Sequence, residues 1–464
     1  MSKYKWITTV VILILVFICN LIKAQSADIE SIPVEGQIKW SNDSIKFFPN
    51  KVVIQSKYDP TYIRFLDVDS LGHFSSILPV GEYVANTLSK YHWQRNWDQG
   101  FIRINDYTSK IIFKIDATVP VVSQTMILDT ISNNFEIPSK GILNQFNDSK
   151  KHELDSFILD QLDYYQVPGA SLAIVKDGKV IYHKNYGVKN PLTKVKVDNT
   201  TLFEAGSITK PVFSFAVLRL VEKGIIDLDI PLYKYLPYDD VSYDERYKLI
   251  TARHVLSHQT GFPNWAERNE NGQFDLLFEP GTQFGYSGEG FEYLKDVVTH
   301  LTNKDIMTIL KEELIEPLDL KNFYFKRDEY TNANASDALN LYTPEKAGFE
   351  KPNMAASLMT TTIDFTRFMI GIEDRVGLSE STYEEMFSKQ VSVNENVSYG
   401  LGIELSRDNV GNFYEHTGVT KNFVSMYRYY PDLDTGFIFF SNNITGGWLT
   451  INTLRQYLIT GKVN

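Results

Sequence analysis

The spacing of apolar residues after position 210 predicts a helix. Apolar side chains recur three and four residues apart, as one face of a helix requires, and Gly224 offers a stop. Ser207 and Lys210 stand where this helix begins, so one interpretation of the pair is a serine N-cap followed by a solvated first-turn lysine. The apolar positions are Val212, Phe213, Ala216, Val217, Leu220 and Val221.

Strand-like runs stand near both ends of the region 150–464. Two runs flank Asp177-Gly178, which is a strong hairpin signal, and a second pair, joined through "PDLDTG", precedes a C-terminal helix. Residues 205–390 between them are mostly helical and loop. Because hairpins cannot form parallel βαβ units, we predict an α+β fold. In this fold an antiparallel sheet, with its first and last strands from opposite ends of the region, is flanked by helices and carries an inserted, mostly helical region.

The N-terminal part has a different pattern. Residues 28–130 contain short strand-like runs separated by turn residues, which predicts a small β-sandwich accessory domain. No constellation of catalytic residue types is visible there. Residues 131–149 are polar and irregular and are interpreted as a linker to the domain at 150–464.

The first residues have the pattern of a targeting segment. Lys3 and Lys5 form a charged start, residues 7–18 an apolar stretch, and Ala24 a cleavage position, so 1–24 is predicted to be a signal peptide. The apolar stretch is short for a membrane span, although an uncleaved anchor stays an alternative. We therefore expect an exported protein of the periplasm or cell envelope, with secretion and membrane anchoring as variants of that localisation.

Composition narrows the chemistry. The net charge of −11 argues against nucleic acid as a partner, and contact with a membrane is expected only if the N-terminal segment is retained. Cys19, the single cysteine, lies inside the predicted signal segment. The exported part then has no thiol nucleophile and no cysteine metal site. Covalent catalysis falls to Ser, Thr or Lys, and we expect neither a metal nor a cofactor.

The Ser207-x-x-Lys210 pair has a second, chemical interpretation. A cation at a helix N-terminus faces the positive end of the helix dipole, which is unfavourable for stability. A serine hydroxyl needs a neighbouring base to act as a nucleophile, and a lysine one turn away supplies one if burial and the helix terminus lower its pKa. The backbone N–H of Ser207 also offers an oxyanion donor at the helix end.

Two further motifs accompany this pair. Tyr286-Ser287-Gly288 precedes a helical pattern, and His416-Thr417-Gly418 precedes the C-terminal strands. With Ser207-x-x-Lys210 they make the region 150–464 resemble the serine β-lactamase and penicillin-binding protein superfamily, in its branch of class C β-lactamases and D-Ala-D-Ala carboxypeptidases. The resemblance implies a β-lactamase/transpeptidase-like fold. Supporting stretches are "VPGASLAIVKDGKVIY", "ITARHVLSHQTGFP" and "SYGLGIEL".

The resemblance also implies roles for individual residues. Ser207 would be the nucleophile, Lys210 would activate it, and Tyr286 would carry a proton to the leaving group. Val419 would provide the second oxyanion N–H, and His416 would orient this edge of the site and the acid group of the substrate. The residues implied for substrate and oxyanion binding are Val419, His416, Thr417, Gly418 and Gly288.

The sequence departs from the superfamily pattern at two of these positions. Gly288 replaces the asparagine of the second motif, so a side-chain amide that usually contacts the substrate is missing. His416 replaces lysine, which leaves a weaker and pH-dependent positive charge. Both changes weaken the case for an efficient antibiotic-hydrolysing β-lactamase, but neither removes the acylating groups.

Other readings of single motifs are less favoured. "GYSGEG" approaches the nucleophile elbow of α/β-hydrolases, but Glu289 stands where the second glycine belongs. His254 and His258 have the i, i+4 spacing of a helical zinc motif, but Val255 replaces its glutamate, so structural histidines are favoured.

The functional prediction is an exported serine hydrolase that forms an acyl-enzyme on a small amide, peptide or ester. A D-amino-acid peptidase or a β-lactamase-like hydrolase fits this description, with a cell-wall-derived substrate as one source. A carboxylesterase of the same fold is an alternative. An alternative of another class is a penicillin-binding sensor or binding protein that is acylated without turnover.

Overall fold

The computed structural model describes residues 31–40, 51–56, 63–69, 72–79, 81–88, 110–115, 122–128, 146, 148–165, 167–339, 344–394, 396–408 and 410–460. The predicted signal peptide 1–24 and most of the predicted linker 131–149 lie outside these residues, so the domain boundaries stay predictions. The described elements fall into two compact units, one with β1 to β7 and one with all elements from α3 onward.

The N-terminal unit is built from strands, in agreement with the β-rich pattern of its sequence. The strands are β1 (Ser31–Trp40), β2 (Lys51–Ser56), β3 (Ile63–Asp67), β4 (His73–Pro79), β5 (Gly81–Leu88), β6 (Lys110–Ile115) and β7 (Val122–Leu128). They form two sheets with the orders β4-β1-β7 and β3-β2-β5-β6. The neighbours are antiparallel except β1 and β7, which pair in parallel. Val34, Val52 and Leu78 are among the buried side chains of these sheets.

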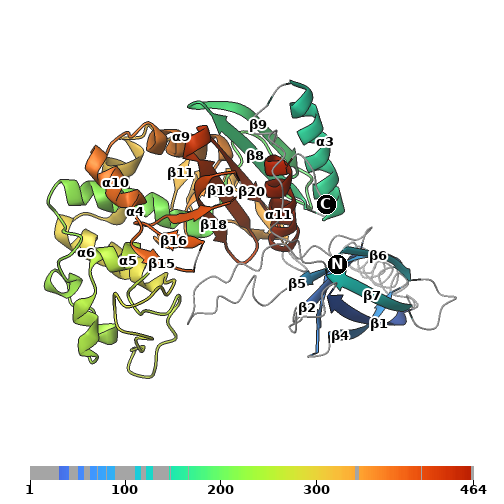
Figure 1. Ribbon diagram of the computed structural model, residues 1–464, viewed down its shortest axis with the longest axis horizontal. Helices are drawn as coiled ribbons and strands as arrows, with labels where there is room; N and C mark the ends of the chain where they lie inside the picture. The colour runs from blue at the N-terminus through green and yellow to red at the C-terminus, as the bar shows by residue number, and fades with distance from the viewer. Residues whose placement is uncertain are drawn as a thin grey trace, which may run out of the picture. The chain divides into compact units, whose positions relative to one another are not determined.

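The second unit is organised around one large antiparallel sheet (Figure 1). Its strands, in spatial order, are β15 (Val391–Ser392), β16 (Val397–Tyr399), β17 (Glu404–Arg407), β18 (Asn412–Val419), β19 (Val424–Tyr430), β20 (Thr435–Ser441), β8 (Gly169–Lys176) and β9 (Lys179–Gly187). β8 pairs antiparallel with β20 from Ala170–Ser441 to Lys176–Thr435, so strands from the two ends of the region belong to one antiparallel sheet, as predicted. Asp177 and Gly178 both have positive φ, as the tight β8–β9 turn requires.

Helices cover both faces of this sheet (Figure 1). α3 (Asp148–Tyr164) and α11 (Ile444–Thr460) pack on one face, and α9 (Thr362–Glu373) packs on the other. Successive residues of β20 alternate between the two cores, with Phe439 in one and Phe440 in the other. Every residue of β20 is therefore buried, which explains its continuous apolar run.

The turn η7 (Pro431–Leu433) joins β19 and β20, and the remaining elements form the inserted, mostly helical region. Its helices are α4 (Thr209–Glu222), α5 (Ala252–Leu256), α6 (Glu289–Thr302), α7 (Ile306–Leu310), α8 (Glu329–Asn334) and α10 (Glu380–Phe387). Its short helical turns are η2 (Gly206–Ile208), η3 (Leu232–Lys234), η4 (Asp239–Val241), η5 (Glu245–Leu249) and η6 (Lys311–Ile315). Short strands are β10 (Phe203–Glu204), β11 (Phe323–Tyr324), β12 (Asp337–Leu339), β13 (Pro344–Lys346) and β14 (Met359–Thr360).

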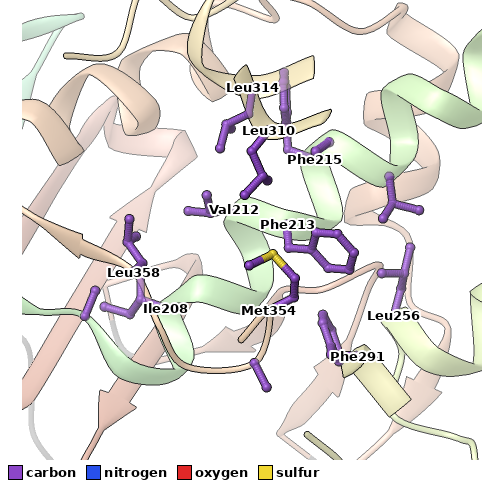
Figure 2. Packing of buried hydrophobic residues seen from close by; sticks show 14 of the residues in the cluster. Ile208, Val212, Phe213, Phe215, Leu256, Phe291, Leu310, Leu314, Met354 and Leu358 are labelled. Carbon is purple, nitrogen blue, oxygen red and sulfur yellow. The ribbon is translucent and has the colours of Figure 1, made fainter. Parts of the chain in front are cut away.

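α4 runs through the centre of this region, as its sequence pattern predicts. Apolar side chains surround it, and Phe213 lies among residues from several other segments (Figure 2). Gly224 follows its C-terminus with φ +67°, a conformation that ends a helix. Because every residue from Thr209 to Leu218 is buried, packing holds this helix, and its N-terminal turn is fixed in place by the core. The neighbours shown include Leu256, Phe291, Leu310, Leu314, Met354 and Leu358.

None of the helices in the described part of the chain combines the length and the apolar character that crossing a membrane requires.

Candidate active site

Ser207 lies in the η2 turn that leads into α4. Gly206 has φ +53°, which turns the chain sharply before the serine, and Thr209 Oγ1 donates to the Gly206 carbonyl oxygen at 2.6 Å. Ile208 occupies the N-cap position of α4, and neither η2 nor α4 has a side-chain capping bond. The interpretation of Ser207 as an N-cap is therefore wrong, and its hydroxyl is available for another contact.

That contact is with Lys210. The Lys210 side-chain nitrogen Nζ lies 3.3 Å from Ser207 Oγ and donates to the Ala355 carbonyl oxygen at 2.9 Å. It also lies 4.6 Å from the centroid of the Tyr286 ring and 5.6 Å from that of Phe291. The side chain is 0% exposed, so the interpretation of Lys210 as a solvated residue is wrong. Burial disfavours the charged form of an amine, and a general base has to be uncharged to accept a proton.

Tyr286 lies between this lysine and a histidine. Its ring stacks on that of His258, with centroids 4.0 Å apart and an interplanar angle of 26°. It also faces the His416 ring at a centroid distance of 6.2 Å. Because the tyrosine is only 3% exposed, these neighbours restrict its orientation beside Lys210 Nζ. The structure thus brings together Ser207, Lys210, Tyr286 and His416, as the sequence motifs predict.

His258 is a site residue that the sequence reading did not include. α5 ends at Leu256, and His258 has φ +60°, so the helical i, i+4 geometry with His254 that a zinc motif needs is not formed. Its Nδ1 accepts a hydrogen bond from the Ser287 backbone N–H at 3.1 Å, and its carbonyl oxygen accepts from Gly285 N–H at 2.7 Å. His258 therefore holds the chain on both sides of Tyr286. Its only sequence signal is the family-like stretch "SHQTG".

Ser287 has a structural role beside Tyr286. Its Oγ donates to the Pro263 carbonyl oxygen at 2.9 Å. It also accepts from the N–H of Gly290, in the first turn of α6, at 3.0 Å. The side chain is 1% exposed. These contacts, together with the antiparallel sheet of this unit, argue against the nucleophile-elbow reading of "GYSGEG".

The His416-Thr417-Gly418 motif lies on β18, next to the turn that carries Ser207. A Cβ atom added to Gly418 would lie 1.8 Å from the Ala205 carbonyl oxygen, so only glycine permits this approach. One added to Gly206 would lie 2.8 Å from the Val419 backbone nitrogen. The Val419 N–H therefore adjoins the Ser207 turn, where the second oxyanion donor is predicted.

His416 itself is 3% exposed on this strand. Its Nδ1 and the Thr417 carbonyl oxygen are 2.7 Å apart. A carbonyl can only accept, so Nδ1 carries a proton, and the neutral ring has its lone pair on Nε2. A ligand carboxylate can receive a hydrogen bond from Nε2 only when the ring is fully protonated.

A half-buried carboxylate lies next to the carbonyl that binds Lys210. Glu292 on α6 accepts a hydrogen bond from the Met354 N–H at 2.7 Å and pairs with Lys295 at 2.8 Å. Burial raises the pKa of the Glu292 carboxyl. The segment that ends in the Ala355 carbonyl is thereby tied to α6. No sequence pattern predicts this contact, because it joins residues far apart in the chain.

Tyr286→Phe is expected to reduce turnover much more than substrate binding. The change removes only the phenolic oxygen and keeps the ring contacts with His258 and Lys210. Loss of a proton-transfer group typically lowers the rate by about 10²–10⁴-fold. Steady-state kinetics measure this effect as a fall in kcat. A rise in KM that exceeds the fall in kcat would instead make Tyr286 a binding residue.

Comparisons with known proteins agree with this geometry. The family model described as Beta-lactamase matches residues 154–451, which is more than half of the chain. Protein flp from Staphylococcus aureus (strain MW2) is 26% identical over 322 residues, covering 64% of this chain and 64% of the relative. An N-acetylmuramyl-L-alanine amidase from Bacillus subtilis (strain 168) is 28% identical over 245 residues, covering 46% of this chain and 51% of the relative. The chain thus spans about two thirds or less of these relatives.

Solved structures show the same fold. The octameric penicillin-binding protein homologue from Pyrococcus abyssi superposes with a TM-score of 0.60 at 22% identity, covering 68% of this chain and 78% of that one. D-alanine carboxypeptidase AmpC from Burkholderia cenocepacia gives a TM-score of 0.55 at 18% identity, covering 67% of this chain and 99% of that one. Given the family match and this shared architecture, the chain belongs to the beta-lactamase family.

Proposed function

We propose that this protein is an exported serine hydrolase that forms an acyl-enzyme at Ser207 on a small amide, peptide or ester. The observation that carries the proposal is the 3.3 Å contact between Ser207 Oγ and the fully buried Lys210 Nζ. A nucleophile and its base within reach of each other are the minimum that acyl transfer requires. Membership of the beta-lactamase family supports a serine hydrolase in general.

In the proposed reaction, neutral Lys210 takes the hydroxyl proton as Ser207 Oγ attacks the substrate carbonyl. The backbone N–H groups of Ser207 and Val419 stabilise the oxyanion that forms. Tyr286 passes a proton to the leaving group as the bond to it breaks, which leaves the acyl group on Ser207. A water molecule then attacks this ester, and its proton returns through the same groups, so that acid and free serine are formed.

The names of two relatives support an amide or peptide as the substrate. One relative is an amidase for N-acetylmuramyl-L-alanine, and one solved neighbour is a D-alanine carboxypeptidase. Both names describe cleavage of an amide bond next to alanine. A D-amino-acid peptide of the cell wall is therefore the substrate that we propose to test before simple esters and β-lactams.

Export is part of the proposal and rests on the N-terminal sequence. The lysines at positions 3 and 5, the apolar stretch 7–18 and Ala24 support a signal peptide. An exported enzyme would meet cell-wall peptides in the periplasm or cell envelope.

A labelling time course tests the proposed function. The purified protein and Ser207→Ala are treated with a fluorescent penicillin and with a fluorophosphonate, and the label is followed over time. A hydrolase gives a penicillin label that forms and then decays while the acid accumulates. A label that lasts indicates a sensor that is acylated without turnover. If wild type takes no label from either reagent, or if Ser207→Ala labels equally, Ser207 is not the nucleophile.

His416→Lys is expected to favour substrates that carry a carboxylate. In the neutral ring Nε2 only accepts, whereas the ordinary pKa of lysine lies well above that of histidine, so lysine donates with a positive charge to higher pH. Charge-assisted hydrogen bonds are roughly twice as strong as neutral ones, so discrimination on the order of 1–2 kcal/mol is expected. The measurement is kcat/KM for a carboxylate-bearing and a neutral ester with both proteins, from about pH 5.5 to 8.5, on both sides of the ordinary histidine pKa of ~6.5.

The ratio of the two kcat/KM values should rise in the lysine variant, most clearly above neutral pH. An unchanged ratio across the whole pH range would show that His416 does not set the preference for a carboxylate.

A further inference from the structure

The carbonyl oxygen of Ala355, which binds the lysine of the site, belongs to a buried turn. The C-terminal side of this turn is joined to the segment that carries the nucleophile. Leu358 accepts a hydrogen bond from the Ala205 N–H at 2.8 Å, and its own N–H donates to Thr209 Oγ1 at 2.9 Å. Because Ala205 and Thr209 flank Ser207, this side of the turn is fixed relative to the serine.

The N-terminal side of the turn is held by one side chain from α6. The Met354 N–H donates to Glu292 Oε1 at 2.7 Å, and Lys295 binds the other carboxylate oxygen, Oε2, at 2.8 Å. The remaining N–H groups of the segment 353–357 all bond inside it. Within the described part of the chain, Glu292 is therefore the only acceptor outside this segment for its backbone N–H groups.

The Ala355 carbonyl determines where the amine of Lys210 points. Nζ donates to this oxygen at 2.9 Å and lies 3.3 Å from Ser207 Oγ. A lysine side chain is flexible, and an uncharged amine accepts a proton only along its single lone pair. The hydrogen bond to Ala355 fixes the direction of that lone pair. A displaced carbonyl would therefore misalign base and nucleophile, although both groups are still present.

We propose that Glu292 is a positioning residue for Lys210. It acts through Met354 and Ala355, because its carboxylate holds the turn, the turn places the carbonyl, and the carbonyl orients the amine. The inference rests on the proposed acyl-enzyme at Ser207 and adds a residue that sets how fast it forms. What this role requires at position 292 is an acceptor oxygen and not a charge.

A pair of substitutions at position 292 tests this role in the full chain. Glu292→Gln keeps an oxygen that accepts from the Met354 N–H, whereas Glu292→Met has a similar length and no such acceptor. The labelling rate of Ser207 is measured against fluorophosphonate concentration, which separates the limiting rate from the half-saturating concentration. Glu292→Met should lower the limiting rate by about 10–10²-fold with an unchanged half-saturating concentration, because small misplacements cost rate rather than binding. Glu292→Gln should keep most of the wild-type rate.

Two further variants separate positioning from charge and from stability. Lys295→Met removes the ion pair but leaves Glu292 Oε1 as an acceptor, so it should label like wild type. Asn353→Ala removes the oxygen that accepts from the Ala355 N–H at 2.9 Å, which loosens the same turn without touching α6. It should lower the limiting rate as Glu292→Met does. The thermal unfolding midpoint is measured for every variant, and labelling is carried out well below the lowest midpoint.

The outcomes distinguish this inference from the proposed function. If Glu292→Met labels at the wild-type rate, or if Glu292→Gln falls as far as Glu292→Met, the inference is wrong while the acyl-enzyme stands. An equal loss in Lys295→Met would assign the effect to the ion pair and overturn the inference too. Wild-type labelling of Asn353→Ala would contradict the path through the turn. If wild type takes no label, the proposed function fails, and this inference fails with it.

Discussion

Lys210→Ala is expected to abolish acylation of Ser207 while the protein stays folded. The change removes the only group found within hydrogen-bonding distance of Ser207 Oγ among the described residues. Loss of a general base typically costs about 10²–10⁴-fold in rate. Because burial and the helix start both disfavour a charge at this position, removing the lysine also removes an unfavourably placed group, which offsets the packing lost. The rate of fluorophosphonate labelling and the thermal unfolding midpoint measure the two effects.

Two variants serve as controls for this result. Lys210→Met keeps an unbranched apolar side chain of similar length, so it fills the space without supplying a base. It should label as slowly as the alanine variant. Lys248→Ala removes a surface lysine that pairs with Glu245 and should label like wild type. Near-wild-type labelling of Lys210→Ala would show that another group activates the serine.

Gly418→Ala is expected to inactivate the enzyme by moving β18 away from the Ser207 turn. The new methyl group would lie 1.8 Å from the Ala205 carbonyl oxygen and 2.4 Å from Ser425 Oγ, so the backbone must shift. Because the Val419 N–H follows directly, a shift of about 1 Å can cost about 10²-fold in rate. Overpacking of this kind also typically lowers stability by about 1–3 kcal/mol. Labelling rate and denaturant unfolding test the two effects.

Gly224→Ala gives a matched loss of stability away from the site. Gly224 has φ +67°, and no atom lies within 4 Å of the position that a Cβ would take. An alanine there therefore has a strained backbone conformation but no steric collision. A left-handed residue costs roughly 1–2 kcal/mol, which is comparable to the loss expected at position 418. If both variants lose activity equally, instability alone accounts for the effect of Gly418→Ala.

Local patterns predicted those parts of the fold that local chemistry determines. The periodicity of residues 212–221 predicted α4, because one helix repeat places those side chains on shared faces. Asp177-Gly178 predicted the β8–β9 hairpin, because both residues tolerate positive φ. The antiparallel sheet followed from the rule that hairpin-connected strands cannot form parallel βαβ units, whereas the pairing of β8 with β20 joins distant segments and was not predicted. The three motifs predicted which side chains the fold brings together.

Contacts between distant loops were beyond the reach of the sequence. The i, i+4 spacing of His254 and His258 suggested one helix face, but the helix ends at Leu256 and the second histidine turns toward Tyr286. Gly288 suggested only a lost amide, because nothing in its neighbourhood shows that Asn264 fills the space. In both cases the missing information was the path of a loop, which is decided by tertiary packing rather than by spacing along the chain.

The location of the covalent adduct tests the central claim most directly. The protein is incubated with a fluorophosphonate, its intact mass is measured, and the modified peptide is sequenced by fragmentation. We predict a single adduct on Ser207, no adduct in Ser207→Ala, and slow formation in Lys210→Ala. An adduct on Ser287, or one that still forms in Ser207→Ala at the wild-type rate, would contradict the assignment of Ser207 as the nucleophile.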